Sequence, residues 1–433
     1  MKRILAFLTT ALIFASCLPQ NTRLPQSPLL SVLERKSGMI AYVGIDGNIY
    51  VSDQGGGNKT AFTNDAVIPE SQSAPFLYYQ YPTWSADSNK LAFVGISGQG
   101  GTASGSTLHV ADMEEEKAKK LFSSETENPI YLYWSPDNEN IGFLSSAASG
   151  QSFLLQNISI DGKRTVLDTG SPYYWSWAPD GSVMIVHAGE AASAIPVRLS
   201  FLQLGDEIIE DQLDTVPASF QAPAWSPDGK HILLSRVNEQ NENEIILTDS
   251  RGRFESVIGG YDVNTAFVWS YDSELVAYID GQTPMTAGAV GTLHVVDTTN
   301  SEDFFQDEGV LAAFWSPNSK KLLYFKPAVP ESSSGEGGDS TGQQFYLSLF
   351  MLDVNSAESR ELFTFQPTNP FASMLFYFDQ YHQSNTIWSP DNNNIVLSFL
   401  TSDGAPGIAI VAASGQMEPR VLDQGYIAYW SWK

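Results

Sequence analysis

The chain has 433 residues, of which 17% are charged and 12% are aromatic, and its formal net charge is -26. Frequent aromatics, glycines and prolines are typical of a folded, strand-rich protein and exclude a disordered one. The negative charge argues against nucleic acid as a partner, because phosphate backbones would be repelled. A cationic partner, a neutral glycan or a peptide is compatible with this charge.

The N-terminus has the features of an export signal. A short basic start precedes the apolar run Ile4–Ala15, which is too short to cross a bilayer. The segment Phe14–Cys17 resembles the lipobox of bacterial lipoproteins, except that phenylalanine stands where leucine is usual. We therefore expect residues 1–17 to be a lipoprotein signal peptide that ends at a lipidated Cys17. An ordinary cleaved signal is the alternative.

Residues 18–37 contain prolines and glutamines and few strand formers, so we expect a tether between the lipid and the folded part. Cys17 is the single cysteine, so the exported chain forms no disulfide. Leu18, and not aspartate, follows Cys17. The lipoprotein resemblance then implies the outer membrane of a bacterium with two membranes, or the outer face of a single cell membrane. Contact with the membrane is expected through the lipid anchor only.

A repeat runs through the rest of the chain. A tryptophan followed three positions later by aspartate or asparagine occurs seven times, mostly at spacings in the forties, and the C-terminus cuts off an eighth copy. Each copy precedes short apolar strands separated by turn residues, about four strands per unit, which is typical of a β-propeller. We interpret the tryptophans as structural wedges between blades and the acidic residues as turn caps. The structural tryptophans are assigned as Trp84, Trp134, Trp177, Trp225, Trp269, Trp315, Trp388 and Trp432.

The repeat predicts an all-β fold, a single eight-bladed β-propeller over residues 38–433 with four antiparallel strands per blade. The strands expected at Met39–Val43 and Asn48–Asp53 lack a tryptophan strand of their own, and the C-terminal segment Tyr426–Trp432 supplies one. The two chain ends should therefore complete one composite blade that closes the ring and leaves no open sheet edge.

The complete motif at Trp225–Ser235, Trp-Ser-Pro-Asp-Gly before an Ile-Leu-Leu strand, resembles the WD40-like repeat of the TolB-like β-propellers. A similar repeat forms the propellers of the prolyl oligopeptidase family. The resemblance covers about residues 38–433 and implies the fold. It implies no single function, because such propellers serve as scaffolds, receptors and peptidase gates. The separate N-terminal α/β domain of TolB proteins is not evident.

Signs of catalysis are weak in this sequence. It has no Gly-x-Ser-x-Gly motif in a hydrolase context and no phosphate-binding glycine loop. Four of the five histidines lie in or beside predicted strands, and only His382 falls in a long aromatic loop. Asp379 and Glu70 are the carboxylates that a channel enzyme could use. We predict no catalytic residue, no metal site and no cofactor.

The segments that lead into the tryptophan strands are rich in aromatic residues. If these segments enter the innermost strands from one face, their side chains gather around one mouth of the channel, where propellers usually bind ligands. The alternative is that these aromatics fill the funnel and the interfaces between blades. The predicted ligand-binding residues are Tyr78, Tyr79, Tyr81, Tyr131, Tyr133, Tyr173, Tyr174, Phe376, Tyr377 and His382.

Together these features predict a lipid-anchored, monomeric, non-catalytic propeller that binds an envelope or extracellular protein, peptide or glycan. Two alternatives stay open at this point. One is a hydrolase or lyase that acts on glycans or peptides in the channel. The other is an accessory scaffold of a transporter or peptidase system.

Overall fold

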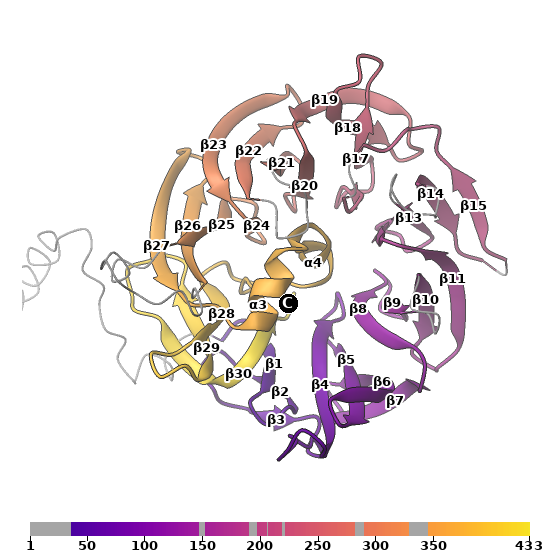
Figure 1. The fold of residues 1–433 in the computed structure, drawn as a ribbon. Coiled ribbons are helices and arrows are strands. Elements are labelled where there is room, and N and C mark those ends of the chain that lie inside the picture. The colour runs from indigo at the N-terminus through magenta and orange to yellow at the C-terminus, as the bar shows by residue number, and fades with distance from the viewer. Residues whose placement is uncertain are drawn as a thin grey trace, which may run out of the picture.

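The computed structural model describes residues 36–146, 152–189, 197–205, 207–218, 221–281, 290–328 and 345–433. These residues form a ring of β-sheets around a central axis (Figure 1). The predicted signal peptide, with Cys17, and most of the predicted tether lie outside the described residues. Within the described ranges, no helix is long and apolar enough to cross a membrane.

Six of the sheets have four antiparallel strands each. The first three sheets consist of β4 (Pro75–Trp84), β5 (Lys90–Gln99), β6 (Thr102–Asp112) and β7 (Lys117–Ser124); β8 (Asn128–Trp134), β9 (Asn140–Ser146), β10 (Phe153–Ser159) and β11 (Arg164–Gly170); and β12 (Tyr173–Trp177), β13 (Val183–Ala188), β14 (Arg198–Gln203) and β15 (Ile209–Gln212). The next three consist of β16 (Ala224–Trp225), β17 (His231–Val237), β18 (Asn243–Asp249) and β19 (Phe254–Tyr261); β20 (Asn264–Trp269), β21 (Leu275–Gly281), β22 (Gly291–Asp297) and β23 (Glu302–Val310); and β24 (Ala312–Trp315), β25 (Lys321–Ala328), β26 (Tyr346–Asp353) and β27 (Glu358–Phe365).

The seventh sheet joins both ends of the chain and has six strands. In spatial order these are β28 (Asn394–Leu400), β29 (Pro406–Ala412), β30 (Arg420–Trp430), β1 (Ile40–Gly44), β2 (Ile49–Ser52) and β3 (Thr60–Ala61).

The all-β architecture with four-stranded antiparallel sheets agrees with the sequence, but the prediction of eight blades was wrong. The reason lies in β30, whose first half pairs with β29 and whose second half pairs with β1. This continuous strand joins the Trp388 unit and the N-terminal unit, which the sequence counts separately, into one sheet. Trp388 itself makes only an isolated bridge to Ile395. The propeller therefore has seven blades when each hydrogen-bonded sheet is counted once.

The repeat motif forms the turn that follows the tryptophan strand. In the complete copy, the Ser226 hydroxyl donates to the Asp228 carboxylate at 2.7 Å and accepts from the His231 amide at 3.0 Å. Gly229 follows with a φ of 73°, a conformation that favours glycine. The serines that make the same pair of bonds in other copies are Ser85, Ser135, Ser270 and Ser389, and Ser316 makes an equivalent pair with the amide oxygen of Asn318 as its acceptor. The acidic residues of the motif are thus engaged in shaping the turn.

The tryptophan indoles connect neighbouring units of the ring. The Trp134 indole donates to the carbonyl of Thr83 at 2.9 Å, and Trp388 donates to Phe314 at 3.1 Å. Trp84, Trp269 and Trp315 make the equivalent bonds. The indole N–H groups of Trp177 and Trp225 have no hydrogen-bond partner in the part of the chain that the structure describes.

In the truncated eighth copy, Trp430 makes the contacts that the repeat tryptophan makes elsewhere, whereas the sequence assigns this position to Trp432. Trp430 is fully buried and its indole donates to the carbonyl of Ser37 at 2.8 Å. The Ser431 hydroxyl accepts from the Met39 amide at 2.8 Å, as the motif serine does elsewhere. Trp432 is only partly buried and lies against Tyr271, with 6.2 Å between the ring centroids.

Two short helices occupy the long interval between Trp315 and Trp388, where the sequence predicts a loop. They are α3 (Asn369–Leu375) and α4 (Phe378–Ser384), and both lie at the centre of the ring (Figure 1). The hydroxyl of Thr368 accepts from the Phe371 amide and caps α3. Helix α3 packs against β28 and β30, whereas α4 packs against β8, β12, β20 and β24. Helix α4 therefore plugs the middle of the propeller.

Candidate functional site

A pocket of about 740 Å³ lies between β4, β8 and β12 on one side and α3, α4 and β30 on the other. We call it the tyrosine pocket. Asp, Glu, Lys, Arg and His are absent from the described residues that line it. In a chain with a net charge of -26, this surface is uncharged. Its ten tyrosines are Tyr78, Tyr79, Tyr81, Tyr131, Tyr173, Tyr174, Tyr377, Tyr381, Tyr426 and Tyr429.

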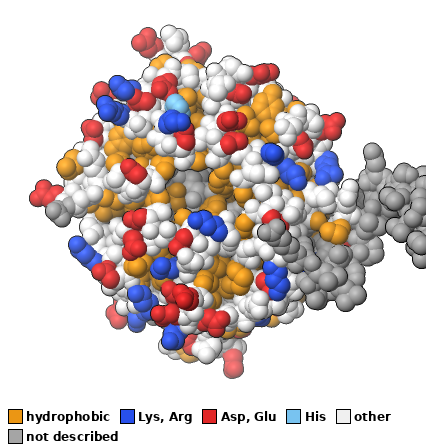
Figure 2. Space-filling model, turned by 180° about the vertical axis from the view of Figure 1, so that it is seen from behind, with side chains coloured by type: hydrophobic (Ala, Val, Ile, Leu, Met, Phe, Trp, Pro, Cys, Tyr) orange, Lys and Arg blue, Asp and Glu red, His pale blue; other side chains and the backbone are white. Residues whose placement is uncertain are grey.

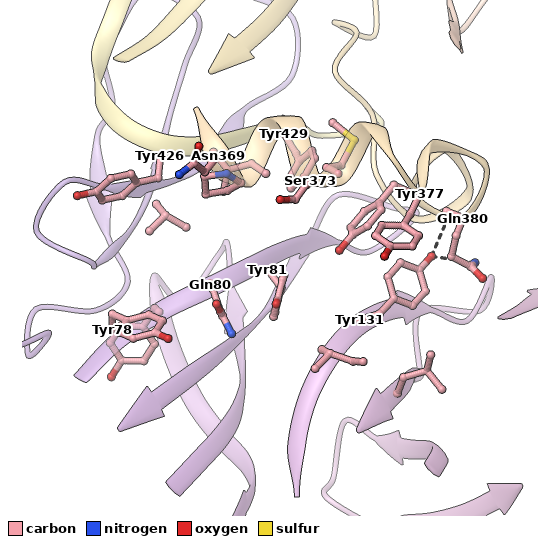
Figure 3. A pocket seen from close by; sticks show the side chains of 18 of the residues that line it. Tyr78, Gln80, Tyr81, Tyr131, Asn369, Ser373, Tyr377, Gln380, Tyr426 and Tyr429 are labelled. Carbon is pink, nitrogen blue, oxygen red and sulfur yellow. Dashed lines mark hydrogen bonds between the residues drawn. The ribbon is translucent and has the colours of Figure 1, made fainter. Parts of the chain in front are cut away.

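Two walls of the tyrosine pocket face each other across open space (Figure 3). Strand β4 contributes Tyr78, Gln80 and Tyr81 to one wall, and β30 with α3 forms the other. Tyr78 is 37% exposed and Tyr377 is 48% exposed, so part of each ring is accessible to a ligand, although Phe76 stacks on Tyr78. Tyrosine rings combine a flat apolar face with a polar tip, which suits recognition of amphipathic molecules.

A bulge in β4 places Tyr81 in the pocket. The pairing of β4 with β5 shifts between Gln80 and Thr83, and Tyr81 has a φ of 56°. A bulky residue in this left-handed region costs on the order of 1–3 kcal/mol, and such outliers cluster at functional sites. Bulges of this kind redirect a side chain next to binding sites. Burial raises the pKa of the Tyr81 phenol, so it stays neutral.

The pocket offers neutral hydrogen-bonding groups. Burial raises the pKa of Tyr131 and Tyr429 well above the ordinary value, so both remain phenols at neutral pH. The side chains of Gln80, Asn369 and Ser373 line the pocket, and among the described residues none has a hydrogen-bond partner for its side-chain groups. The pocket therefore combines stacking surfaces with amide and hydroxyl groups that a ligand can engage.

Gln380 fixes α4 at the end of the pocket. Its amide nitrogen donates to the Tyr131 hydroxyl at 3.1 Å and to the Trp175 carbonyl at 3.0 Å, and its amide oxygen accepts from the Trp175 amide at 3.2 Å. The Tyr131 hydroxyl in turn donates to the Gln380 carbonyl at 2.9 Å (Figure 3). These buried bonds hold the helix against β8 and β12, so the pocket wall is preformed.

The structure brings seven of the ten sequence-predicted ligand residues into the tyrosine pocket: Tyr78, Tyr79, Tyr81, Tyr131, Tyr173, Tyr174 and Tyr377. Tyr133 and His382 instead line a second pocket on the other side of α4. Phe376 packs against the main hydrophobic core and lines neither pocket.

Sequence reasoning missed Tyr381, Tyr426 and Tyr429. The signal for the last two was present, because Tyr426–Trp430 is another aromatic segment that leads into a repeat tryptophan. The same segment also closes the ring, which explains its strand character without a role in binding. Tyr381 lies in the long aromatic loop that the sequence predicts, and α4 places it in the wall of the pocket.

The two carboxylates considered for a channel enzyme do not meet in the tyrosine pocket. Asp379 is 1% exposed, lines the second pocket and accepts from the amides of Ala222 and Gln380, each at 3.0 Å. Glu70 is exposed and lines neither pocket. In the described ranges, no group of three or more His, Cys, Asp or Glu side chains is arranged to hold a metal ion.

No family model and no curated protein matches the sequence. Among solved structures, the chain is similar to the dihydro-heme d1 dehydrogenase NirN, with 13% identity over 96% of this chain and 78% of that one and a TM-score of 0.54. It also matches an oligogalacturonate lyase in complex with manganese (12% identity, 81% and 96% coverage, TM-score 0.49). A third match is TolB from Acinetobacter baumannii (13% identity, 82% and 66% coverage, TM-score 0.38).

Identities this low show the fold alone, and only the NirN match has a TM-score above 0.5. The β-propeller fold that the TolB-like resemblance implies is confirmed by the ring of four-stranded antiparallel sheets. The WD40 repeat type, the lipoprotein nature and the ligand stay predictions.

Proposed function

We propose that the protein is an envelope-anchored binding module that takes an uncharged glycan in the tyrosine pocket. The observation that carries this proposal is the lining of the pocket, with ten tyrosines and no charged side chain among its described residues. Sugar rings present apolar C–H faces that stack on tyrosine, and their hydroxyl groups match free amide and hydroxyl side chains such as Gln80, Asn369 and Ser373. A volume of about 740 Å³ fits a short oligosaccharide.

The glycan proposal is tested with the full-length protein on arrays of neutral glycans, acidic glycans and uncharged peptides. We expect capture of neutral glycans and a loss of about tenfold or more in affinity for the variant Tyr78→Ala/Tyr377→Ala, because two open stacking surfaces disappear. Both side chains are partly exposed, so the variant should keep its fold. The control is Phe254→Ala, which removes an aromatic side chain that is 50% exposed and outside the pocket.

Two outcomes would contradict the glycan proposal. One is equal affinity of the double variant and the Phe254→Ala control. The other is capture of acidic glycans or peptides alone, since that would assign the pocket to a different ligand class.

The location at the envelope is part of the same proposal and rests on the lipobox at Phe14–Cys17. Replacing Cys17 with serine should move the protein from the membrane fraction to the soluble exported fraction, because serine cannot receive the lipid. Immunoblots of fractionated cells measure this, with Thr22→Ser as the control substitution. Retention of the Cys17→Ser protein in membranes would contradict a lipid anchor at this residue.

A further inference from the structure

The second pocket, which we call the lower pocket, lies on the other side of α4 from the tyrosine pocket and has a volume of about 290 Å³. Figure 2 shows hydrophobic side chains around a central hollow on the face opposite to the view of Figure 1. Tryptophan dominates the lining because five of the repeats contribute their tryptophan to it. The nine aromatic lining residues are Trp84, Tyr133, Trp134, Trp177, Trp225, Phe267, Trp269, Tyr271 and Trp432.

Helix α4 separates two different chemical environments. Gln380 and Tyr381 line the tyrosine pocket, whereas Asp379, His382 and Gln383 line the lower pocket. Residues three or four positions apart share a helix face, so this spacing directs the two sets to opposite sides. Among the residues that the structure describes, none with a charged side chain lines the tyrosine pocket, and Asp379 is the one carboxylate residue that lines the lower pocket.

Asp379 has no cationic partner among the described residues. Its two oxygens accept only from the backbone amides of Ala222 and Gln380, and none of the ion pairs formed by described residues includes it. His382 does not supply the charge, since burial lowers its pKa to about 3 and its Nε2 accepts from the Trp315 amide at 3.3 Å. A buried carboxylate without a cation is costly to the fold.

We propose that the lower pocket binds an alkylated ammonium ion, with the positive charge near Asp379 and the alkyl groups against the tryptophan and tyrosine faces. Tryptophan is the aromatic side chain that attracts cations most strongly, and aromatic cages are the usual receptors for quaternary ammonium groups. The volume of about 290 Å³ suits a small cation or the end of a modified side chain. A net charge of -26 on the chain also raises the local concentration of cations.

The ionisation of Asp379 supports this assignment. Burial raises the pKa of Asp379 to about 6, so the carboxylate lacks the stabilisation that a nearby cation gives. A bound ammonium ion would supply this stabilisation without any change in the backbone hydrogen bonds of Asp379.

The test compares choline with its neutral isostere 3,3-dimethylbutan-1-ol by calorimetry and tryptophan fluorescence on the full-length protein. Choline should bind about tenfold or more tightly than the isostere, because both fill the same space and only one carries charge. Asp379→Asn should remove most of that preference. Trp432→Leu, which changes a partly buried wall residue near the end of the chain, should weaken choline binding several-fold. The control Asp403→Asn removes an exposed carboxylate elsewhere and should leave binding unchanged.

Three results would overturn the proposal: no binding of choline, equal binding of choline and the isostere, or an unchanged preference in a folded Asp379→Asn variant. Trp432→Leu is a second test in case Asp379→Asn does not fold, because it changes the aromatic lining of the lower pocket and leaves Asp379 in place. The test is independent of the glycan experiment, because the residues changed there line only the tyrosine pocket.

Discussion

Replacing Trp430 with alanine is expected to lower the free energy of unfolding by about 3–5 kcal/mol, whereas Trp432→Ala should cost about 1 kcal/mol. Trp430 is fully buried in the strand that closes the ring, and its indole bond to Ser37 connects the two ends of the chain. Its removal leaves a cavity and an unpaired carbonyl at the closure. Trp432 lies two residues later, is partly buried and has open space on one side.

Urea unfolding followed by circular dichroism measures both tryptophan variants, and the midpoint shift is the quantity to compare. The pair is matched, because each variant removes one tryptophan from the same tripeptide. Equal shifts would contradict the prediction that Trp430, and not Trp432, stabilises the closure of the ring. A small shift for Trp430→Ala would mean that the pairing of β1 with β30 alone closes the ring.

The repeat motif and its spacing were enough to predict a propeller, but they did not give the number of blades. Trp-Ser-Pro-Asp turns specify local geometry, as the bonds of Ser226 and Asp228 show, and each unit carries its own copy. Whether two repeat units form one sheet depends on whether a single strand pairs with strands of both units. Arg420–Trp430 runs for 11 residues and changes partner between Gln424 and Gly425, and a lone glycine within a strand is equally compatible with a bulge or a bend.

The central helices show a different limit of sequence reasoning. Thr368, Asn369 and Pro370 form a recognisable helix start, yet the aromatic residues that follow read as a loop, because each helix is only seven residues long. The aromatic mouth could be predicted from segments that precede tryptophans. Its division into an uncharged pocket and a pocket with a carboxylate could not, since it depends on which faces of α4 meet the ring.

The contribution of Asp379 to the free energy of unfolding should fall as the pH rises from about 4 to about 7, and Asp379→Asn should remove this contribution. The folded protein holds the proton up to a pKa of about 6, whereas the ordinary value is 3.8. Between these values unfolding releases a proton, so the stability contributed by Asp379 is present at low pH and is lost as the pH rises through about 6. A difference of about two pKa units corresponds to roughly 3 kcal/mol.

The measurement is the difference in unfolding free energy between the parent and Asp379→Asn at several pH values, since the many other carboxylates then cancel. The parent should lose roughly 3 kcal/mol relative to the variant between pH 4 and pH 8. The groups near the carboxylate do not titrate in this window: His382 has a pKa of about 3, and burial raises the pKa of Tyr174 well above its ordinary value. Gln416→Ala, an exposed neutral substitution, should show a difference that does not vary with pH. A pH-independent difference for Asp379→Asn would refute a proton held on the buried carboxyl.

If choline occupies the lower pocket, saturating choline should reduce the pH dependence of the parent, because a bound cation stabilises the same carboxylate in its charged form.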